Sequence, residues 1–292
     1  MKTIILIGRT GYVGSRYVEY FKARNIKHII VPDRKTIQGD YLAYVNNLLQ
    51  DTDPAIVVNA AGYTGKPNVD ACETDKGECV EGNVTFPYKL AKICQDNGAI
   101  LGHVSSGCIY SGSKGSRGFT EEDEPNFTFR QNNCSFYSGT KALGEEVLES
   151  FNNVYIWRLR IPFDNINSPR NYLTKLMTYQ TLLEAENSIS DLNEFVVATT
   201  KLLETESPFG IYNVTNTGYV TTSGVVDLLK KYNLPNKKHK YKFFDTIDDF
   251  MLKAAKTPRS NCIMDNSKLL NCGVYMSESY EAIEKNLKLW TA

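Results

Sequence analysis

The stretch GRTGYVG constrains the fold more than any other feature of the chain. It contains Gly8, Gly11 and Gly14 and directly follows an apolar run, Thr3–Ile7, which predicts a strand. A helical pattern, Val13–Arg24, begins inside the stretch. Glycines between a strand and a helix permit a tight turn and let a pyrophosphate approach backbone N–H groups. We therefore predict a dinucleotide-binding turn, with a plain strand-to-helix turn as the alternative.

Apolar runs and helical patterns alternate through the first half of the chain. Strands that alternate with helices of about ten to fifteen residues indicate crossover connections and a parallel sheet covered on both faces. The sequence therefore predicts an α/β fold with a doubly wound parallel sheet. The further predicted strands are His28–Val31, Ala55–Asn59, Ile100–Ser105 and Val154–Leu159, and the further predicted helices are Tyr41–Leu49, Asn83–Asn97 and Tyr137–Ser150.

The alternation loosens after about residue 161. A helix over Asp191–Glu204 and a strand over Ile211–Val214 are predicted to rejoin the main sheet. We predict a dinucleotide-binding domain over residues 1–161, joined by residues 190–215, and a smaller substrate-binding lobe over residues 162–189 and 216–292. A chain of 292 residues is long enough for both.

Composition argues against several classes of partner. The 33 basic and 33 acidic residues balance without a basic block, so neither a nucleic acid nor a membrane surface is expected as a partner. The first strand begins too early to leave room for a signal peptide. The seven cysteines are scattered without metal-binding spacing, so we expect free thiols, no metal and a cytoplasmic location.

The end of the second predicted strand bears on the choice of cofactor. The sequence VPDRK offers Asp33 for the ribose 2′-hydroxyl of NADH and Arg34 for the 2′-phosphate of NADPH. Arg9, inside the glycine turn, offers a second guanidinium for that phosphate. We therefore predict NADPH and keep NADH as the alternative.

A tyrosine and a lysine in FYSGTKALGEE are candidates for acid–base chemistry. Tyr137 and Lys141 are four residues apart on a predicted helix, so their side chains share one face. A phenol with a pKa of about 10 is a poor acid or base at neutral pH, but a neighbouring ammonium lowers that pKa. An ordinary structural pair is the alternative.

The GxxGxxG spacing resembles the extended branch of the short-chain dehydrogenase/reductase superfamily, whose catalytic triad is Ser or Thr, Tyr and Lys. In SSGCIY the resemblance selects Ser106, four residues before Tyr110, and it adds Tyr137 and Lys141. The cofactor-binding residues that follow are Gly8, Arg9, Thr10, Gly11, Tyr12, Val13, Gly14, Arg34, Asn59, Ala60, Ala61, Tyr137 and Lys141.

Cys108 suggests a second reaction. It lies two residues after Ser106, so in extended backbone the thiol and the hydroxyl point to the same side. A ketone acidifies the C–H bonds on both neighbouring carbons, and a thiolate can remove such a proton. Return of a proton on the opposite face inverts the carbon. Because hydride transfer destroys the ketone, such epimerisation must precede reduction. Ordinary burial of the thiol is the alternative.

Five segments in order sharpen the resemblance: NAAGYTGKPNVDACE, SSGCIY, FYSGTKA, NSPRNYLTK and PRSNCIMDNSKL. They resemble the dTDP-4-dehydrorhamnose reductase family and, within it, the plant bifunctional epimerase/reductases of nucleotide-rhamnose synthesis. The resemblance implies an epimerase pair, Cys108 and Lys175, although a solvated helix residue is the alternative for Lys175. Ala71 departs from the plant pattern, where an aromatic residue is expected. The implied substrate-binding residues are Thr64, Lys66, Asn68, Asp70, Asn83, Arg170, Asn171 and Arg259. Asn83 is expected to position the active-site backbone, with a helix cap as the alternative.

The resemblance implies a bifunctional 3,5-epimerase/4-reductase that converts UDP-4-keto-6-deoxy-D-glucose to UDP-L-rhamnose with NADPH. Its substrate partner is a UDP- or dTDP-linked 4-keto-6-deoxyhexose, supplied by an upstream 4,6-dehydratase, and assembly as a homodimer is left open. One alternative is a dTDP-4-dehydrorhamnose reductase that only reduces C4. The other is a non-catalytic, NADP-binding regulatory subunit, like the beta subunit of methionine adenosyltransferase.

Overall fold

The structure is a computed structural model that describes residues 2–52, 55–115, 117–236 and 238–291. The chain forms two compact units. The first contains the residues up to Ser106, together with Ser135–Arg158 and Thr199–Tyr212. The second contains Gly107–Cys134, Leu159–Ala198 and the residues from Asn213 onward. The predicted division differs from this one, because it placed residues 107–134 and 190–198 in the first domain.

A six-stranded sheet forms the centre of the first unit, in the order β10-β5-β4-β3-β1-β2. The pairings of β1 with β2, β1 with β3 and β3 with β4 are parallel, which confirms the predicted doubly wound α/β fold. Every residue of β1 and β3 is buried, as expected for strands covered on both faces. The strands are β1 (Thr3–Ile7), β2 (His28–Ile30), β3 (Ala55–Asn59), β4 (Ile100–Ser106), β5 (Val154–Leu159) and β10 (Gly210–Asn213).

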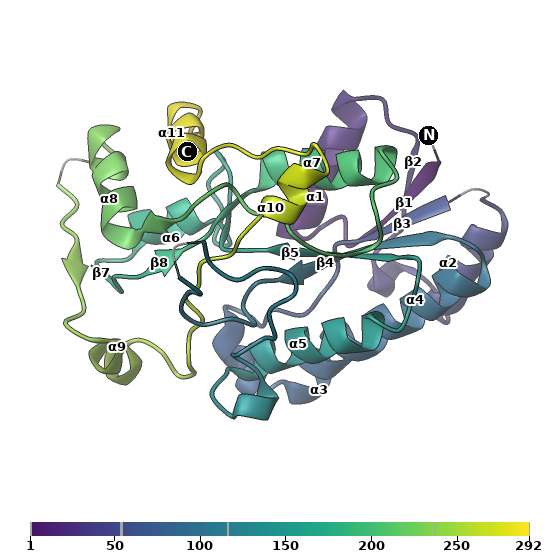
Figure 1. Cartoon of the computed structure of the whole chain (residues 1–292), viewed down its shortest axis with the longest axis horizontal. Coiled ribbons are helices and arrows are strands. Elements are labelled where there is room, and N and C mark those ends of the chain that lie inside the picture. Colours follow the sequence, from purple (N-terminus) through teal and green to yellow (C-terminus); the bar gives the residue numbers. More distant parts are fainter. Residues whose placement is uncertain (1, 53–54, 116, 237, 292) are drawn as a thin grey trace. The chain divides into compact units, whose positions relative to one another are not determined.

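Helices cover both faces of this sheet (Figure 1). In the picture, α2, α4 and α5 follow one face, and α1 lies along the other. Side chains from the strands and from α2 and α4 form one core, which includes Ile5, Val57, Phe86, Leu90 and Ile156. The helices of the first unit are α1 (Tyr12–Ala23), α2 (Tyr41–Gln50), α3 (Lys76–Val80), α4 (Phe86–Asp96) and α5 (Phe136–Leu148), with short turns η1 (Arg34–Thr36) and η2 (Val69–Glu73). Helix α7 (Leu192–Glu204) begins in the second unit, and its residues from Thr199 onward belong to the first.

The helix predicted over Asn83–Asn97 begins earlier in the structure. Helical backbone starts at Lys76 and passes through a π-helical turn, η3 (Glu81–Thr85), into α4. Asn83 therefore lies inside a continuous helical segment, and its alternative prediction as a helix cap is wrong. The predicted strand Ile211–Val214 is confirmed as β10, which joins the main sheet beside β5.

The second unit consists of short strands, helices and loops. Three two-stranded ladders pair β6 with β9, β7 with β12 and β8 with β11. A separate apolar core includes Phe163, Leu173, Leu176, Val225 and Ile283. The elements are η4 (Phe129–Gln131), β6 (Pro162–Phe163), α6 (Tyr172–Thr178), β7 (Thr181–Leu182), β8 (Glu186–Asn187), β9 (Ser190–Asp191), β11 (Val220–Thr221), α8 (Thr222–Lys231), β12 (Lys242–Phe243), α9 (Ile247–Lys253), α10 (Ser267–Asn271) and α11 (Ser279–Lys288).

Within the described residues, no helix combines the length and the apolar composition needed to cross a membrane.

Candidate active site

The glycine turn after β1 has the close packing that a dinucleotide requires. Gly8 has φ +87°, and a Cβ there would lie 2.6 Å from the backbone nitrogen of Ala61. A Cβ at Gly14 would lie 2.0 Å from the carbonyl oxygen of Gly8. Helix α1 starts after Gly11 without a side-chain cap or an acidic residue in its first turn. Its N-terminal N–H groups therefore fit the pyrophosphate of a dinucleotide. Arg9, Thr10, Tyr12 and Val13 complete this predicted segment.

Two arginines flank Asp33 beside this turn. The carboxylate of Asp33 accepts a 3.2 Å hydrogen bond from Thr10 Oγ1 and lies 3.7 Å from a guanidinium nitrogen of Arg9. The Arg34 guanidinium lies over the ring of Phe86, 4.0 Å from its centroid. The side chains of Arg9 and Arg34 keep exposed fractions of 43% and 47%. The arrangement fits a 2′-phosphate, because both cations remain accessible while the Asp33 carboxylate already has partners.

The end of β3 carries a buried polar pair. Asn59 is fully buried, and its amide nitrogen lies 3.0 Å from His103 Nδ1. Its amide oxygen accepts a 3.0 Å hydrogen bond from the backbone of Ala61. Burial lowers the pKa of His103 well below its usual range, and the charge of Lys141 acts in the same direction. The side chain of Asn59 therefore holds the strand end, and the backbone of Ala60 and Ala61 lies directly against Gly8 of the glycine turn.

The predicted reductive triad comes from β4 and α5. Ser106 is the last residue of β4, and Tyr137 and Lys141 lie on α5, whose first turn is capped by the side chain of Ser135. Lys141 is buried, and its Nζ donates a 3.3 Å hydrogen bond to the carbonyl oxygen of Val104 in β4. This hydrogen bond therefore holds the Lys141 side chain against the strand that ends in Ser106.

A buried ion pair behind the triad was not predicted. Ser105 Oγ donates a 2.5 Å hydrogen bond to the Glu145 carboxylate, and Arg158 donates to the same group from Nε at 2.9 Å and from a terminal nitrogen at 2.7 Å. All three side chains are buried. The network joins β4, α5 and β5, so it fixes the helix that carries Tyr137 against the strand that carries Ser106.

Asn83 joins the loop after β3 to α5. Its side chain accepts from the backbone N–H of Tyr63 at 2.9 Å and donates to the Tyr63 carbonyl oxygen at 2.9 Å. It also donates to Thr140 Oγ1 at 3.2 Å. Because Asn83 is fully buried, its side chain positions backbone instead of reaching a substrate. In the loop after β3, Thr64, Lys66 and Asn68 are exposed. Asn68 Oδ1 accepts a 2.9 Å hydrogen bond from the backbone N–H of Asp70.

In the second unit, Cys108 is half-buried and lies against a buried arginine. A terminal nitrogen of Arg160 donates a 3.0 Å hydrogen bond to Cys108 Sγ. The other terminal nitrogen donates to Asn187 Oδ1 and to the Ser260 carbonyl oxygen, each at 2.5 Å. A Cβ at Gly107 would lie 2.2 Å from Met264 Sδ, so a larger residue before the thiol would displace the Met264 side chain. The sequence did not predict Arg160; its only signal was a charged residue just past the end of an apolar strand.

Lys175 lies in the same unit, on α6, and is half-buried. Burial lowers its pKa, and the guanidinium groups of Arg170 and Arg259 act in the same direction, while the Cys108 thiol opposes them. The fold therefore brings Cys108, Lys175, Arg170 and Arg259 within electrostatic reach of one another, although they are distant in sequence. An amine with a lowered pKa is better suited to exchange protons near neutral pH than an ordinary lysine.

The side chain of Asn171 stabilises the start of α6 and the loop before it. Its side chain is fully buried and caps α6 by accepting from the backbone N–H of Leu173 at 2.9 Å. Its amide nitrogen donates to the carbonyl oxygens of Asp164 and Ile166, each at 2.8 Å. The predicted direct contact of this side chain with a substrate is therefore at odds with the structure, because its hydrogen bonds serve the loop before α6.

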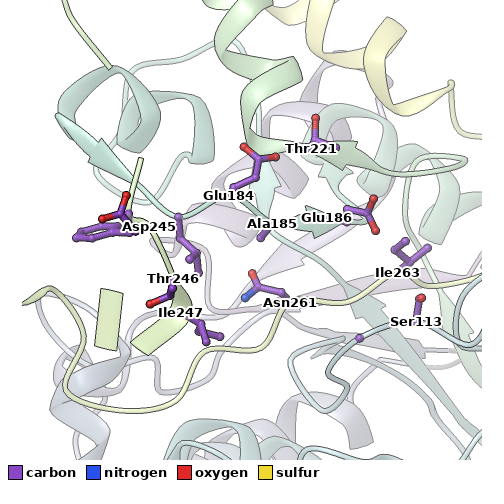
Figure 2. A pocket seen from close by; sticks show the side chains of 13 residues that line it. Ser113, Glu184, Ala185, Glu186, Thr221, Asp245, Thr246, Ile247, Asn261 and Ile263 are labelled. Carbon is purple, nitrogen blue, oxygen red and sulfur yellow. The ribbon is translucent and has the colours of Figure 1, made fainter. Parts of the chain in front are cut away.

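A pocket of about 570 Å³ lies in the second unit (Figure 2). Its lining includes the carboxylates of Glu184, Glu186 and Asp245, with Thr221 and Asn261, and no lysine or arginine among the lining residues that the structure describes. This chemistry suits a neutral group with hydroxyl or N–H donors better than a phosphate. Among the described residues, no cluster of three or more His, Cys, Asp or Glu side chains could hold a metal ion.

Two known plant proteins are similar to this chain over most of its length. A bifunctional dTDP-4-dehydrorhamnose 3,5-epimerase/dTDP-4-dehydrorhamnose reductase of Arabidopsis thaliana is 34% identical over 275 residues, covering 91% of this chain and 85% of that protein. A trifunctional UDP-glucose 4,6-dehydratase/UDP-4-keto-6-deoxy-D-glucose 3,5-epimerase/UDP-4-keto-L-rhamnose-reductase of the same plant is 33% identical over 271 residues, covering 91% of this chain but only 39% of that longer protein.

Known structures share the fold. The L780 UDP-rhamnose synthase of Acanthamoeba polyphaga mimivirus matches with a TM-score of 0.86 and 23% identity, over 99% of each chain. The dTDP-4-dehydrorhamnose reductase of Bacillus anthracis, solved in complex with NADP, matches with a TM-score of 0.78 and 19% identity, over 98% of each chain. Residues 1–287 also match the sequence profile described as the RmlD substrate binding domain. The chain, with its glycine turn, its Ser-Tyr-Lys set and its second unit, therefore belongs to the RmlD substrate-binding-domain family.

Proposed function

We propose that the protein reduces a nucleotide-linked 4-keto-6-deoxyhexose and also epimerises it at C3 and C5 before reduction. The reductase part is supported by the relatives and by Ser106, Tyr137 and Lys141 on adjoining elements. The epimerase part is carried by one observation: Cys108 is half-buried, hydrogen-bonded by Arg160 and within electrostatic reach of Lys175. The two groups of residues belong to different units of the chain.

The reduction uses residues of the first unit. NADPH, the proposed cofactor, supplies the hydride when bound. Tyr137 donates the proton that the C4 oxygen needs, and Ser106 orients the ketone by a hydrogen bond. The Lys141 ammonium favours the phenolate that remains on Tyr137, and its bond to Val104 keeps it on the strand that ends in Ser106. The dinucleotide is held by the turn from Gly8 to Gly14 and, at a 2′-phosphate, by Arg9 and Arg34.

The epimerisation uses residues of the second unit. The Cys108 thiolate removes a proton from C3 or C5, and the electron pair moves into the ketone to form an enolate. The Lys175 ammonium returns a proton to that carbon on the opposite face, which leaves the amine neutral. Because burial and Arg170 lower the pKa of Lys175, the ammonium gives up this proton more readily than an ordinary lysine does. Solvent then restores both groups.

The proposed substrate is UDP-4-keto-6-deoxy-D-glucose, supplied by a 4,6-dehydratase, and the product is UDP-L-rhamnose; the dTDP-linked sugar is the alternative. UDP is supported by the names of the trifunctional relative and of the L780 structure. Arg170 and Arg259 are proposed to bind the diphosphate, because guanidinium groups match phosphate oxygens. Lys66 and its exposed neighbours Thr64 and Asn68, with the half-buried Asp70, are proposed to contact the sugar.

The test measures how much deuterium the sugar product takes up from the solvent. The UDP- and dTDP-linked 4-keto-6-deoxyglucose are each incubated with the protein and NADPH in D₂O, and the product is analysed by mass spectrometry and NMR. We expect deuterium at C3 and C5 but not at C4, with faster turnover of the UDP sugar. A Cys108→Ala variant should lose the label, whereas the matched control Cys272→Ala, which removes another half-buried thiol of the second unit, should keep it.

The alternatives give different results. A protein that only reduces C4 would oxidise NADPH with an already epimerised ketosugar and would incorporate no deuterium. A non-catalytic subunit would bind NADPH without oxidising it in the presence of any of these sugars. Unchanged labelling in Cys108→Ala would contradict the role proposed for the thiol.

A further inference from the structure

We propose that Arg160 is a positioning residue for the epimerisation: its guanidinium holds the Cys108 side chain and stabilises the thiolate that removes the proton. The inference rests on the proposed epimerase function and extends it to a residue that no sequence motif indicated. It is carried by the 3.0 Å hydrogen bond from the Arg160 guanidinium to Cys108 Sγ.

The guanidinium is fixed in place by contacts on both sides. Arg160 has an exposed fraction of only 3%, and its backbone N–H donates to Ser190 Oγ at 3.0 Å. One terminal nitrogen is held by Asn187 Oδ1 and the Ser260 carbonyl oxygen, which leaves the other directed at Cys108. Such a forked, planar donor loses little conformational freedom when it binds an anion, so Arg160 is already oriented to bind the Cys108 sulfur.

The chemistry of the contact favours the reactive form of the thiol. A guanidinium stays protonated throughout the pH range of proteins, so Arg160 does not exchange a proton in the reaction. A permanent cation with an N–H directed at sulfur stabilises the thiolate over the thiol. The proton from the sugar is therefore taken up by Cys108, and Arg160 acts through it.

Other charged or titratable groups face the same cluster. Lys175 interacts with Cys108, and Arg170 and Arg259 interact with Lys175. A second thiol, Cys262, also interacts with Arg160 and Cys108, but it is buried and donates to the Gly107 carbonyl oxygen at 3.3 Å. Burial raises the pKa of Cys262 in spite of Arg160. Cys262 is therefore expected to be inert, and Cys108 is the thiol through which the arginine charge acts.

The experiment compares Arg160→Met and Arg160→Gln, which remove the charge, with Arg160→Lys, which keeps it without the fork. The first readout is the pH profile of iodoacetamide alkylation at Cys108, followed by mass spectrometry of its peptide, with Cys262 as the internal comparison. In the neutral variants we expect the profile to move to higher pH and the rate at pH 7 to fall about tenfold to hundredfold, as for loss of a hydrogen bond to a charged group. Arg160→Lys should recover part of the loss.

The second readout is deuterium exchange at C3 and C5 in the proposed reaction. Exchange should fall about tenfold to hundredfold in the neutral variants, and reduction of an already epimerised ketosugar should fall much less. Two neutral variants are used so that a folding defect in one, detected by circular dichroism, leaves the other. Alkylation that is as fast as in wild type at every pH in a folded neutral variant overturns the proposal. If the wild-type protein exchanges no deuterium, the epimerase function fails, while the alkylation profile still decides the role of Arg160.

Discussion

In the first unit, the reactive side chains stand on long regular elements, whereas in the second unit they stand on short ones. Ser106 ends a strand of the six-stranded sheet, and Tyr137 and Lys141 share one face of α5. Cys108 follows that strand in a turn, and Lys175 belongs to the short helix α6. The proposed reduction and the proposed epimerisation therefore depend on different kinds of structural support.

The supporting contacts differ in the same way. In the first unit, the buried pair of Glu145 and Arg158 joins helix α5 to strand β5 of the six-stranded sheet. In the second unit, Arg160 links Cys108 to Asn187 and Ser260, which come from a two-residue strand and a loop. We infer that substitutions in the first unit separate into catalytic and stability effects, while in the second unit one side chain serves both the local fold and the reactivity.

The largest expected effect comes from Tyr137→Phe, which separates the two chemistries. Loss of the phenolic proton donor should reduce the rate of C4 reduction about 10² to 10⁴-fold. Deuterium exchange at C3 and C5 should continue, because Cys108 and Lys175 remain. NADPH oxidation and isotope content are measured on the same sample. The control is Tyr88→Phe, at an exposed tyrosine of α4.

Equal loss of exchange and reduction in Tyr137→Phe would contradict the proposal that the two reactions use different residues, because the phenol would then take part in both steps.

The next effect concerns the stability of the protein and a substitution at Arg158, two residues before Arg160. Arg158→Met leaves the buried Glu145 carboxylate without its cation, which typically costs about 3 to 5 kcal/mol in the free energy of unfolding. Urea denaturation monitored by circular dichroism measures it. The control is Lys92→Met, which removes an exposed pair with Asp96 and should cost less than about 1 kcal/mol.

Activity measurements sharpen this prediction. Below its unfolding transition, Arg158→Met should lower reduction more than exchange, because its network holds the helix that carries Tyr137 against the strand that ends in Ser106. Selective loss of exchange, as expected for Arg160→Met, would remove the distinction between the two arginines.

The sequence predicted the regular elements well because their signals are local. The strands Thr3–Ile7, Ala55–Asn59 and Val154–Leu159 were predicted with the observed limits, since each is a short apolar run bounded by polar or turn residues. The start of the helix before Asn83 was missed. Gly77 and Gly82 lower the helix propensity there, and packing against α5 overrides that preference.

The candidate site divides in the same way. Tyr137 and Lys141 were predicted from their spacing, and the structure places both on α5. Cys108 was predicted from extended backbone after Ser106, but the strand ends at Ser106 and Cys108 lies in a turn, so alternation along a strand does not determine where its thiol points. Arg160 was not predicted, because its partner Ser260 is 100 residues away in sequence and their contact exists only in the fold. The same holds for Glu145, whose partner Ser105 precedes it by 40 residues. Contacts of this kind leave no periodic pattern in a single sequence.

The smallest expected effect concerns Asp191, a buried carboxyl group of the second unit that should make the free energy of unfolding depend on pH. Burial raises the pKa of Asp191 from 3.8 to about 6, and Glu194 acts in the same direction, against hydrogen bonds from Asn286 and Asn193. Between these two pH values the folded protein keeps a proton that the unfolded chain releases. Stability from this group is therefore fully present below about pH 4 and is lost as the pH rises through 6.

An Asp191→Asn variant removes this dependence. Relative to wild type, its free energy of unfolding should rise by about 3 kcal/mol between pH 4 and pH 7, because a tenfold change in a protonation equilibrium corresponds to about 1.4 kcal/mol. Urea titrations at several pH values measure the difference. Glu284→Gln is the contrasting variant: Lys231 and Tyr232 lower the pKa of Glu284 to about 2, so its contribution is present above about pH 4.5 and is lost as the pH falls. A difference between Asp191→Asn and wild type that stays constant from pH 4 to pH 7 would mean that the second unit buries this carboxyl group without the predicted cost.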